Sequence, residues 1–149
     1  MKIIIKTFDE LTSNELYQIL RLRSKVFVVE QECIYLDCDD NDRRASHLFV
    51  EDGGSIAGYL RIMDKGIVFD AMSIGRVVVR KEYRKNGIAK HMVRVAIKYI
   101  TQYLHETIIK ISAQQYLIEF YEDMGFAVVS PGYLEDGIPH IDMKYIHNL

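Results

Sequence analysis

The sequence predicts an α/β fold, a three-layer α/β/α sandwich whose sheet is mixed but largely antiparallel. The first observation is the order of strand-like and helix-like segments, β-α-β-β-β-α-β-α-β-β. The second is that consecutive strands joined by short turns precede two helical crossovers, which places helices on the faces of a sheet. The third is size: 149 residues, 49% of them hydrophobic, suffice for a sizeable core, so we expect a single domain over residues 1–149.

The first strand and the first helix are predicted from the opening residues. Met1–Glu10, MKIIIKTFDE, has a short apolar run between lysines, which indicates a strand and neither a secretory signal nor a membrane span. Thr12 and Glu15 are spaced as a capping box at a helix start. Apolar residues follow at helical spacing, namely Leu16, Ile19, Leu20, Val26 and Phe27. We expect this helix to end before the acidic loop CIYLDCDDNDRR.

The middle of the chain is predicted to form a hairpin, a further strand and a long helix. Strands over His47–Glu51 and Ile56–Met63 flank DGGS, whose glycines permit a hairpin turn. A second turn around Asp64–Gly66 leads to a strand over Ile74–Val79. A helix is then expected from Gly87 to about Tyr103.

The last third is predicted to be strand, helix and two more strands. Thr107–Ser112 is rich in β-branched residues, and Gln115–Met124 is expected to be a helix that Gly125 terminates. The segments FAVVS and HIDMKYI alternate as strands and are joined by the loop PGYLEDGIP. Too few βα units alternate for a doubly wound nucleotide-binding fold.

Charge and cysteine content limit the partners that we expect. The net charge is −2, from 19 basic and 21 acidic side chains, so no overall field favours nucleic acid or an anionic membrane, and neither is an expected partner. Cys33 and Cys38 have no matching Cys/His pair, so we expect two reduced thiols, no metal and a cytoplasmic location.

The chemistry-bearing stretch is RVVVRKEYRKNGIAKHMVRVAIKYI, from Arg76 to Ile100. A strand passes into a helix there through a basic junction that contains Gly87. The first amides of a helix lack intrahelical partners and a glycine lets an anion approach the backbone, so the junction suits a phosphate group. It has neither the GxxxxGK[ST] nor the GxGxxG spacing. The alternative is an ordinary glycine turn with solvated basic side chains.

Several motifs carry a resemblance to a known family. VVVRKEYRKNGIAKHMV resembles the acetyl-coenzyme A motif of the GNAT superfamily of N-acetyltransferases, with R-x-x-G-x-A at Arg84 to Ala89. YEDMGF, Tyr121 to Phe126, is similar to the family's Y-x-x-x-G-F signature. RSKVFVVEQE, IGRVVV, AQQYLIEFYEDMGF and EDGIPHIDM resemble the small bacterial ElaA-like subgroup. The resemblance covers most of the chain and implies the GNAT-type sandwich, with acetyl-coenzyme A as the cosubstrate.

The resemblance also implies which residues bind the coenzyme. The strand that pairs with the pantetheine arm would be Val77, Val78 and Val79. The pyrophosphate would be held by Arg84, Lys85, Asn86, Gly87, Ile88, Ala89 and Lys90. Gln114 stands where many relatives have asparagine and keeps an amide for a polar coenzyme contact, and Ala89 stands where many have glycine.

Acyl transfer from a thioester to an amine needs a base for the amine, a polarised carbonyl and a proton for the leaving thiolate. An amine is itself a competent nucleophile, so no acyl-enzyme is required. The resemblance places Tyr121 beside the coenzyme sulfur as general acid, and the alternative is a tyrosine of the core. A backbone N–H near Val78 or Val79 would polarise the carbonyl.

The general base has two candidates, His140 and Glu30. Imidazole exchanges protons near neutrality, although histidines at strand starts are commonly structural. Glu30 has the alternative of pairing with an arginine, Arg23 or Arg76. Simple alternation puts Arg76 on the strand face of Ile74 and Val78, which indicates a paired charge or a contact with a substrate carboxylate.

The function predicted from the sequence is N-acetyltransfer from acetyl-coenzyme A directly to a primary amine of an unidentified small molecule or peptide. The alternative is a non-catalytic acyl-coenzyme A-binding sensor or adaptor of the same fold. An acyl-homoserine lactone synthase, whose early region can resemble RSKVF, is disfavoured by the short chain, the lack of tryptophan and the later motifs. A homodimer is an expectation of the family alone.

Overall fold

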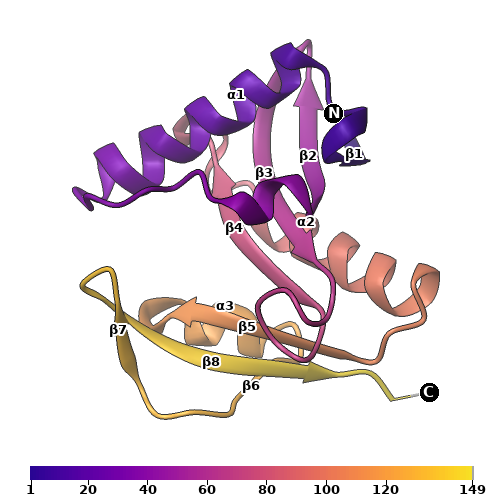
Figure 1. Cartoon of the computed structure of the whole chain (residues 1–149), viewed down its shortest axis with the longest axis vertical. Helices are drawn as coiled ribbons and strands as arrows, with labels where there is room; N and C mark the ends of the chain where they lie inside the picture. The colour runs from indigo at the N-terminus through magenta and orange to yellow at the C-terminus, as the bar shows by residue number, and fades with distance from the viewer. Residues whose placement is uncertain (149) are drawn as a thin grey trace.

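The computed structural model describes residues 1–148, and Figure 1 shows the arrangement of its elements. The strands are β1 (Lys2–Thr7), β2 (Ser46–Asp52), β3 (Ser55–Met63), β4 (Ser73–Val79), β5 (Ile108–Gln114), β6 (Ala127–Val128), β7 (Tyr133–Glu135) and β8 (Ile138–Ile146). The α-helices are α1 (Ser13–Arg23), α2 (Ile88–Lys98) and α3 (Ile118–Glu122). Helix α1 continues as a π-helical segment over Ser24–Glu30, α2 continues likewise over Tyr99–Tyr103, and a 3₁₀ turn over Gln115–Leu117 precedes α3. Further 3₁₀ turns cover Phe8–Glu10, Asp40–Arg43 and Lys81–Tyr83.

The strands form two antiparallel sheets that meet at one point. The first sheet has the order β1-β2-β3-β4, and the second has the order β5-β8-β6 with β7 paired to the start of β8. A parallel bridge between Met72 and Ile109 joins them, and the Lys110 N–H donates to the Met72 carbonyl at 2.8 Å. The expected mixed sheet is therefore split, because β4 and β5 pair at one end and then separate.

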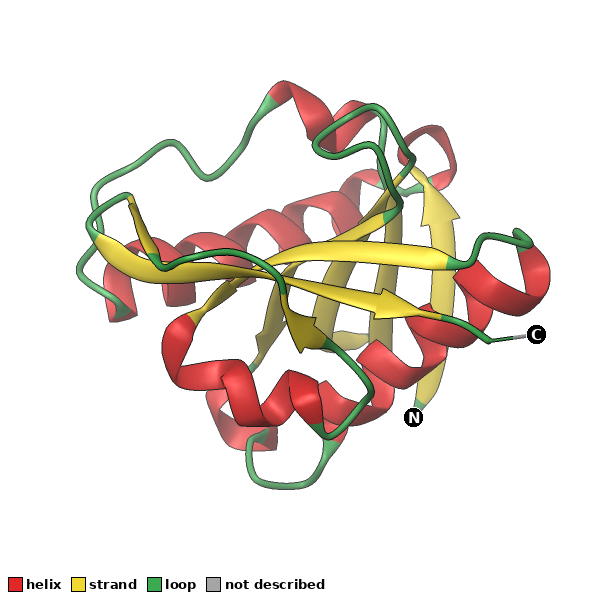
Figure 2. Cartoon of the chain, turned by 90° about the horizontal axis from the view of Figure 1, so that it is seen from below, coloured by secondary structure: helices red, strands yellow, loops and turns green. Residues whose placement is uncertain are grey.

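Helices cover both faces of the strands, which confirms the expected α/β sandwich (Figure 2). Helix α1 packs on one face of the first sheet through Ile19 and Leu22, against Phe49 and Tyr59. On the other face, α2 and α3 share a larger core with β2, β3, β4, β5 and β8. Buried apolar area drives this packing, and the shared core holds the two sheets to the same pair of helices.

The predicted ends of two helices are confirmed. At the start of α1 the Glu15 N–H donates to Thr12 Oγ1 at 3.1 Å, and the Thr12 N–H donates to Glu15 Oε1 at 2.9 Å. After α3, Gly125 adopts φ +101°, the left-handed conformation that glycine reaches without a Cβ clash. The sequence did not predict β7, which is only three residues long and lies within the segment expected to be a loop.

A β-bulge in β4 corrects the expected alternation around Arg76. The pairing of β3 with β4 shifts register between Tyr59 and Arg61, and Arg76 has φ +54°. As a result, Ile74 packs in the core beneath α2 while Val78 packs beneath α1, on the opposite face. An inserted residue turns the side chains that follow it to the opposite face of the sheet. Ile74 and Val78 therefore lie on different faces, and Arg76 cannot share a face with both of them.

Candidate active site and coenzyme cleft

A cavity of about 990 Å³ occupies the space that opens between β4 and β5. Its walls come from β4, the start of α2, the end of β5, α3, the loop after the first helix and the β7–β8 turn. Of the residues predicted for the site, the cavity brings together Val77, Val78, Val79, Arg84, Lys85, Gly87, Ile88, Ala89, Lys90, Gln114, Tyr121 and His140. Asn86 and Glu30 do not line it.

One edge of β4 faces this cavity without a strand partner. Strand β3 pairs with β4 from Ser73 to Val79, and the pairing of β4 with the second sheet ends at Met72. The described residues supply no neighbouring strand beside Val77–Val79 on that edge. A free strand edge binds extended, amide-bearing molecules through main-chain hydrogen bonds.

The start of α2 presents free amide groups to the same cavity. Gly87 caps the helix at φ +74°, and the first intrahelical bond runs from the His91 N–H to the Gly87 carbonyl at 3.0 Å. The N–H groups of the first helical residues, Ile88–Lys90, therefore precede the intrahelical ladder. Lys85 adds a positive charge beside them and is held at φ +67°. This end of the cavity suits an anionic group.

Arg84 uses its guanidinium in a way that the sequence did not indicate. Its Nε donates to the Val79 carbonyl at 3.0 Å, and its Nη1 and Nη2 donate to Glu30 at 2.8 and 3.2 Å. Glu30 therefore does pair with an arginine, but the partner is Arg84, and the suggested partners Arg23 and Arg76 were wrong. Glu30 ends the π-helical segment after α1 and lines a separate hollow of about 320 Å³.

Tyr121 lies in the cavity wall on α3. It is 7% exposed, and its ring makes edge contacts with Phe120 and Phe126 at centroid distances of 5.0 and 5.6 Å. Burial in this apolar setting raises the pKa of the Tyr121 phenol above its ordinary value. The hydroxyl therefore keeps its proton at neutral pH and is available as a donor.

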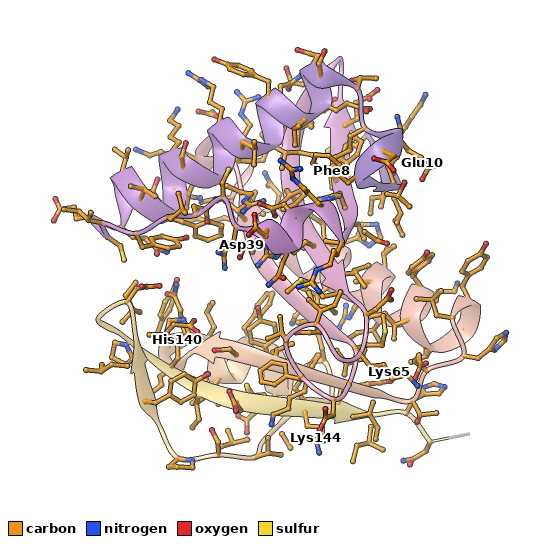
Figure 3. All side chains as sticks on the ribbon, viewed as in Figure 1. Phe8, Glu10, Asp39, Lys65, His140 and Lys144 are labelled. Atoms are coloured by element: carbon orange, nitrogen blue, oxygen red, sulfur yellow. The ribbon has the colours of Figure 1, made fainter. Side chains whose placement is uncertain are left out.

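His140 reaches the cavity from the start of β8. Its Nδ1 lies 2.7 Å from the Ile138 carbonyl, which requires Nδ1 to carry the proton and donate it. That assignment leaves Nε2 as the acceptor in the neutral ring, 3.4 Å from Glu135 Oε2. The Gln115 side-chain amide donates to the His140 carbonyl at 3.0 Å and anchors the strand there. In Figure 3, His140 belongs to the lower half of the molecule, across from the loop that carries Asp39.

A buried ionic network supports the other wall of the cavity. Arg23, which is fully buried, donates to Asp37 at 2.8 Å and to Asp42 at 2.7 Å. Arg61 donates to the same Asp42 oxygen and to Asp39, at 2.7 Å each. These bonds tie the acidic loop between the first helix and β2 to both α1 and β3.

Two more side chains, Arg76 and Tyr35, extend this network. Arg76 Nε lies 2.9 Å from Asp37, and the Tyr35 hydroxyl donates to that carboxylate at 2.6 Å. Burial alone raises the pKa of the Asp42 carboxyl, but hydrogen bonds and attraction from Arg23 and Arg61 outweigh it, so its pKa lies below the ordinary value. One residue of this network had a signal in the sequence, namely Arg76, a charged residue on a strand face that we expected to be buried.

The described residues show no arrangement of three or more His, Cys, Asp and Glu side chains that could hold a metal ion. Both cysteines are free thiols, Cys33 buried and Cys38 exposed. Within residues 1–148 there is also no helix with the length and apolar character needed to cross a membrane.

Comparison with known proteins identifies the family. Residues 10–147 match the family described as the acetyltransferase (GNAT) domain. Escherichia coli ElaA is 34% identical over 137 residues, which cover 91% of this chain and 90% of ElaA. The crystal structure of E. coli ElaA superposes with a TM-score of 0.89 and 31% identity, covering 97% of this chain and 98% of that one.

Two further solved structures have the same fold. An acyl-CoA N-acyltransferase from Pseudomonas aeruginosa superposes with a TM-score of 0.91 and 35% identity, covering 97% of this chain and 99% of that one. An aminoglycoside 6′-N-acetyltransferase, solved in complex with coenzyme A, has a TM-score of 0.68 at 17% identity and covers 96% of each chain. At that identity the likeness concerns the fold alone.

The fold and the cavity define an acyltransferase of the GNAT class. The chain belongs to the GNAT acetyltransferase family and, within it, to the ElaA-like subgroup. The family and the fold indicate acyltransferase activity in general.

Proposed function

We propose that this chain transfers the acetyl group of acetyl-coenzyme A directly to a primary amine. One observation carries the proposal. A single cavity joins an unpaired strand edge, an open helix N-terminus and a buried tyrosine hydroxyl. These three parts match an amide-bearing arm, a diphosphate and a leaving thiolate, which are the successive parts of an acyl-coenzyme A.

The coenzyme is proposed to lie along β4. The pantetheine amides pair with the free edge at Val77–Val79, and the diphosphate accepts hydrogen bonds from the amides of Ile88–Lys90, with Lys85 beside it. Gln114, at the end of β5, supplies a polar contact. Arg84 is proposed to support this site through its bonds to Val79 and Glu30, which use three of its five N–H groups.

The chemistry needs no covalent enzyme intermediate. The neutral amine attacks the thioester carbon and the C–N bond forms, while a main-chain N–H of Val78 or Val79 stabilises the developing oxyanion. The C–S bond then breaks, and Tyr121 gives its proton to the departing thiolate. His140 takes the proton of the amine through Nε2. We propose His140 and not Glu30 as the base, because both Glu30 carboxylate oxygens bind Arg84 outside the cavity.

Tyr121→Phe tests the proposal, because it removes the proton donor and keeps the ring. We expect turnover to fall by about 10²–10⁴-fold with kcat and kcat/KM reduced together, and coenzyme A affinity to stay nearly unchanged. Tyr17→Phe, on the exposed side of α1, is the matched control and should have no effect. Full turnover by Tyr121→Phe would remove Tyr121 from the mechanism.

His140→Gln tests the base in the same assay. The variant should lose turnover with little loss of coenzyme affinity, and the acidic limb of its pH–rate profile should flatten. A profile that overlays the parent profile would assign proton removal to bulk water.

The second candidate function is a non-catalytic acyl-coenzyme A sensor, in a cytoplasm that keeps Cys33 and Cys38 reduced. It is favoured by the Glu30–Arg84 pair, which links the proposed coenzyme site to the segment that follows the first helix. The two functions are separated by measuring the release of coenzyme A from acetyl-coenzyme A in the presence of a panel of primary amines. An acetyltransferase releases coenzyme A with an accepted amine, and a sensor does not. Tight acetyl-coenzyme A binding with no release for any amine would support the sensor.

A further inference from the structure

We propose that the acceptor is an aliphatic diamine, a primary amine whose apolar chain ends in a second cationic group. This inference rests on the proposed function and adds the substrate class to it. It is drawn from the distribution of charge and apolar surface at the end of the cavity away from α2, which we call the acceptor end. Its residues are Phe27, Leu36, Glu135, Asp136, Ile138 and His140.

The cavity is polarised along its length. At the end beside the start of α2, which we call the coenzyme end, Arg84 is paired with Glu30 and Lys90 with Asp123. Within residues 1–148, Lys85 and the free amides of the helix start are then its unpaired positive groups. Glu135 and Asp136 line the acceptor end. In the described part of the chain, the Glu135 carboxylate has one basic neighbour within ion-pair distance, His140 at 3.4 Å, and Asp136 has none. An anionic coenzyme and a cationic acceptor would thus be drawn to opposite ends.

The cations that also line the cavity do not cancel these carboxylates. Arg61 is bound by Asp39 and Asp42, and Arg76 lies beside Asp37 and Asp39. With Arg23, the network contains three arginines and three aspartates, so its formal charge is zero. The charge left over at the acceptor end is that of Glu135 and Asp136.

Two buried polar groups mark where the reacting amine would sit. Tyr121 is 7% exposed and lines the cavity, and its hydroxyl has no hydrogen-bond partner within residues 1–148. His140 is 8% exposed, and its Nε2 has only the 3.4 Å approach to Glu135. Both side chains line the cavity and neither of these atoms is sealed away from it, so a ligand in the cavity can supply the hydrogen bond that each lacks. Asp136 belongs to the turn next to His140 and suits the far end of that ligand.

The acceptor end is also apolar, which favours a carbon chain between the two amines. Leu36 lines the cavity although it is 80% exposed, and Phe27 and Ile138 complete the apolar surface. The Cys33 thiol donates to the main-chain carbonyl of Asp136 at 3.4 Å, which ties the backbone of this turn to the loop after the first helix. The Asp136 carboxylate is exposed on that turn, beyond the apolar wall, where it can attract a cation at some distance from the reacting nitrogen.

The test compares amines of equal length in the presence of acetyl-coenzyme A. The panel contains 1,4-diaminobutane and 1,5-diaminopentane, the monoamines butylamine and pentylamine, and 4-aminobutanoate. We expect each diamine to have a KM about tenfold or more below that of its monoamine, the contribution of one charge-assisted contact. The advantage should shrink as salt is added. Equal KM values for diamine and monoamine, or a preference for 4-aminobutanoate, would overturn the inference.

Asp136→Asn gives the matched variant, since asparagine tolerates the left-handed backbone of this position. It should raise the KM for the diamines about tenfold, leave kcat within about twofold and leave the monoamines unaffected. The control is Asp9→Asn, an exposed aspartate between Phe8 and Glu10, which lie far from His140 in Figure 3. A diamine KM that does not change in Asp136→Asn would also overturn the inference.

A binding measurement separates this inference from the proposed function. We would titrate 1,4-diaminobutane into the protein with coenzyme A bound, using the parent and Asp136→Asn. Binding that weakens in the variant supports the acceptor class even if no amine is acetylated, in which case the proposed function fails alone. Turnover of monoamines without any diamine preference would leave the proposed function intact and overturn the acceptor class.

Discussion

The two ends of the cavity are built in different ways. The coenzyme end comes from one continuous segment, residues 77–90, and presents main-chain groups at a free strand edge and a helix start. The acceptor end is assembled from the segment after α1, the β7–β8 turn and the start of β8. It presents side chains to the ligand. The buried ionic network holds in place the acidic loop that forms one of its walls. Recognition by the main chain needs local geometry, whereas recognition by side chains from three segments depends on the tertiary fold.

This difference predicts which property of the protein is lost when each end is altered by substitution. Strain in residues 77–90 should weaken coenzyme binding and leave the rest of the molecule folded. Damage to the ionic network should destabilise the protein, because a buried charge that loses its partner is costly. Substitutions at the two ends can therefore be told apart by whether binding or stability changes.

The largest effect is expected for Arg23→Gln. The substitution leaves Asp37 and Asp42 with fewer partners in a buried site, so the free energy of unfolding should fall by about 3–5 kcal/mol. Denaturant unfolding measures the loss. Arg21→Gln, an exposed position on the same helix, is the control and should stay within about 0.5 kcal/mol of the parent. An Arg23→Gln protein as stable as Arg21→Gln would show that the network does not support the fold.

Gly87→Val should act on the coenzyme end. A β-branched residue is strained at φ +74°, and a displaced helix start loses its contacts with the diphosphate, so binding of coenzyme A should weaken by about 1–3 kcal/mol. Gly53→Val puts the same residue at φ +58° in the β2–β3 turn and is the matched control for backbone strain. Calorimetric titration should show normal affinity for Gly53→Val. Equal losses of affinity in both variants would mean that strain, and not the site, is responsible.

The smallest expected effect is a change in how the stability of the folded protein depends on pH. The pKa of Asp42 lies below its ordinary value in the folded protein, so its contribution to stability is present above the pKa of an unfolded aspartate, about 4. The contribution is lost as the pH falls through the folded pKa. Thermal unfolding from neutral to acidic pH should show a decline that is shallower in Arg23→Gln. The same slope in both proteins would argue against coupling between Arg23 and Asp42.

The strand edge and the helix start at the proposed coenzyme end were predictable because their residues are neighbours in the sequence. A β-branched run, a glycine and basic residues within one segment indicate a strand edge and a helix start before any tertiary contact is known. The same local logic predicted the capping box at Thr12 and the helix end at Gly125.

His140 was a candidate from the sequence, but the side-chain contacts that support the walls of the cavity were not predictable, because their partners are far apart in the sequence. The partner of Glu30 is 54 positions away, and the Arg23–Asp42 pair depends on how the acidic loop folds back onto α1. No pattern in the neighbouring sequence indicated the bulge at Arg76. The bulge turns the side chains that follow it to the opposite face of the sheet. Side-chain pairs between distant segments are set by packing, which periodicity along the chain does not report.

Hydrogen–deuterium exchange with and without coenzyme A tests most directly whether the two ends have separate tasks. Coenzyme A should slow exchange of the amides at residues 77–79 and 88–90, since these donate to the ligand or are covered by it. Exchange at residues 134–138, in the β7–β8 turn, should stay unchanged until an amine is added. Protection centred on residues 134–138, or none at either end under conditions where coenzyme A binds, would contradict the assignment of the coenzyme to the β4–α2 end.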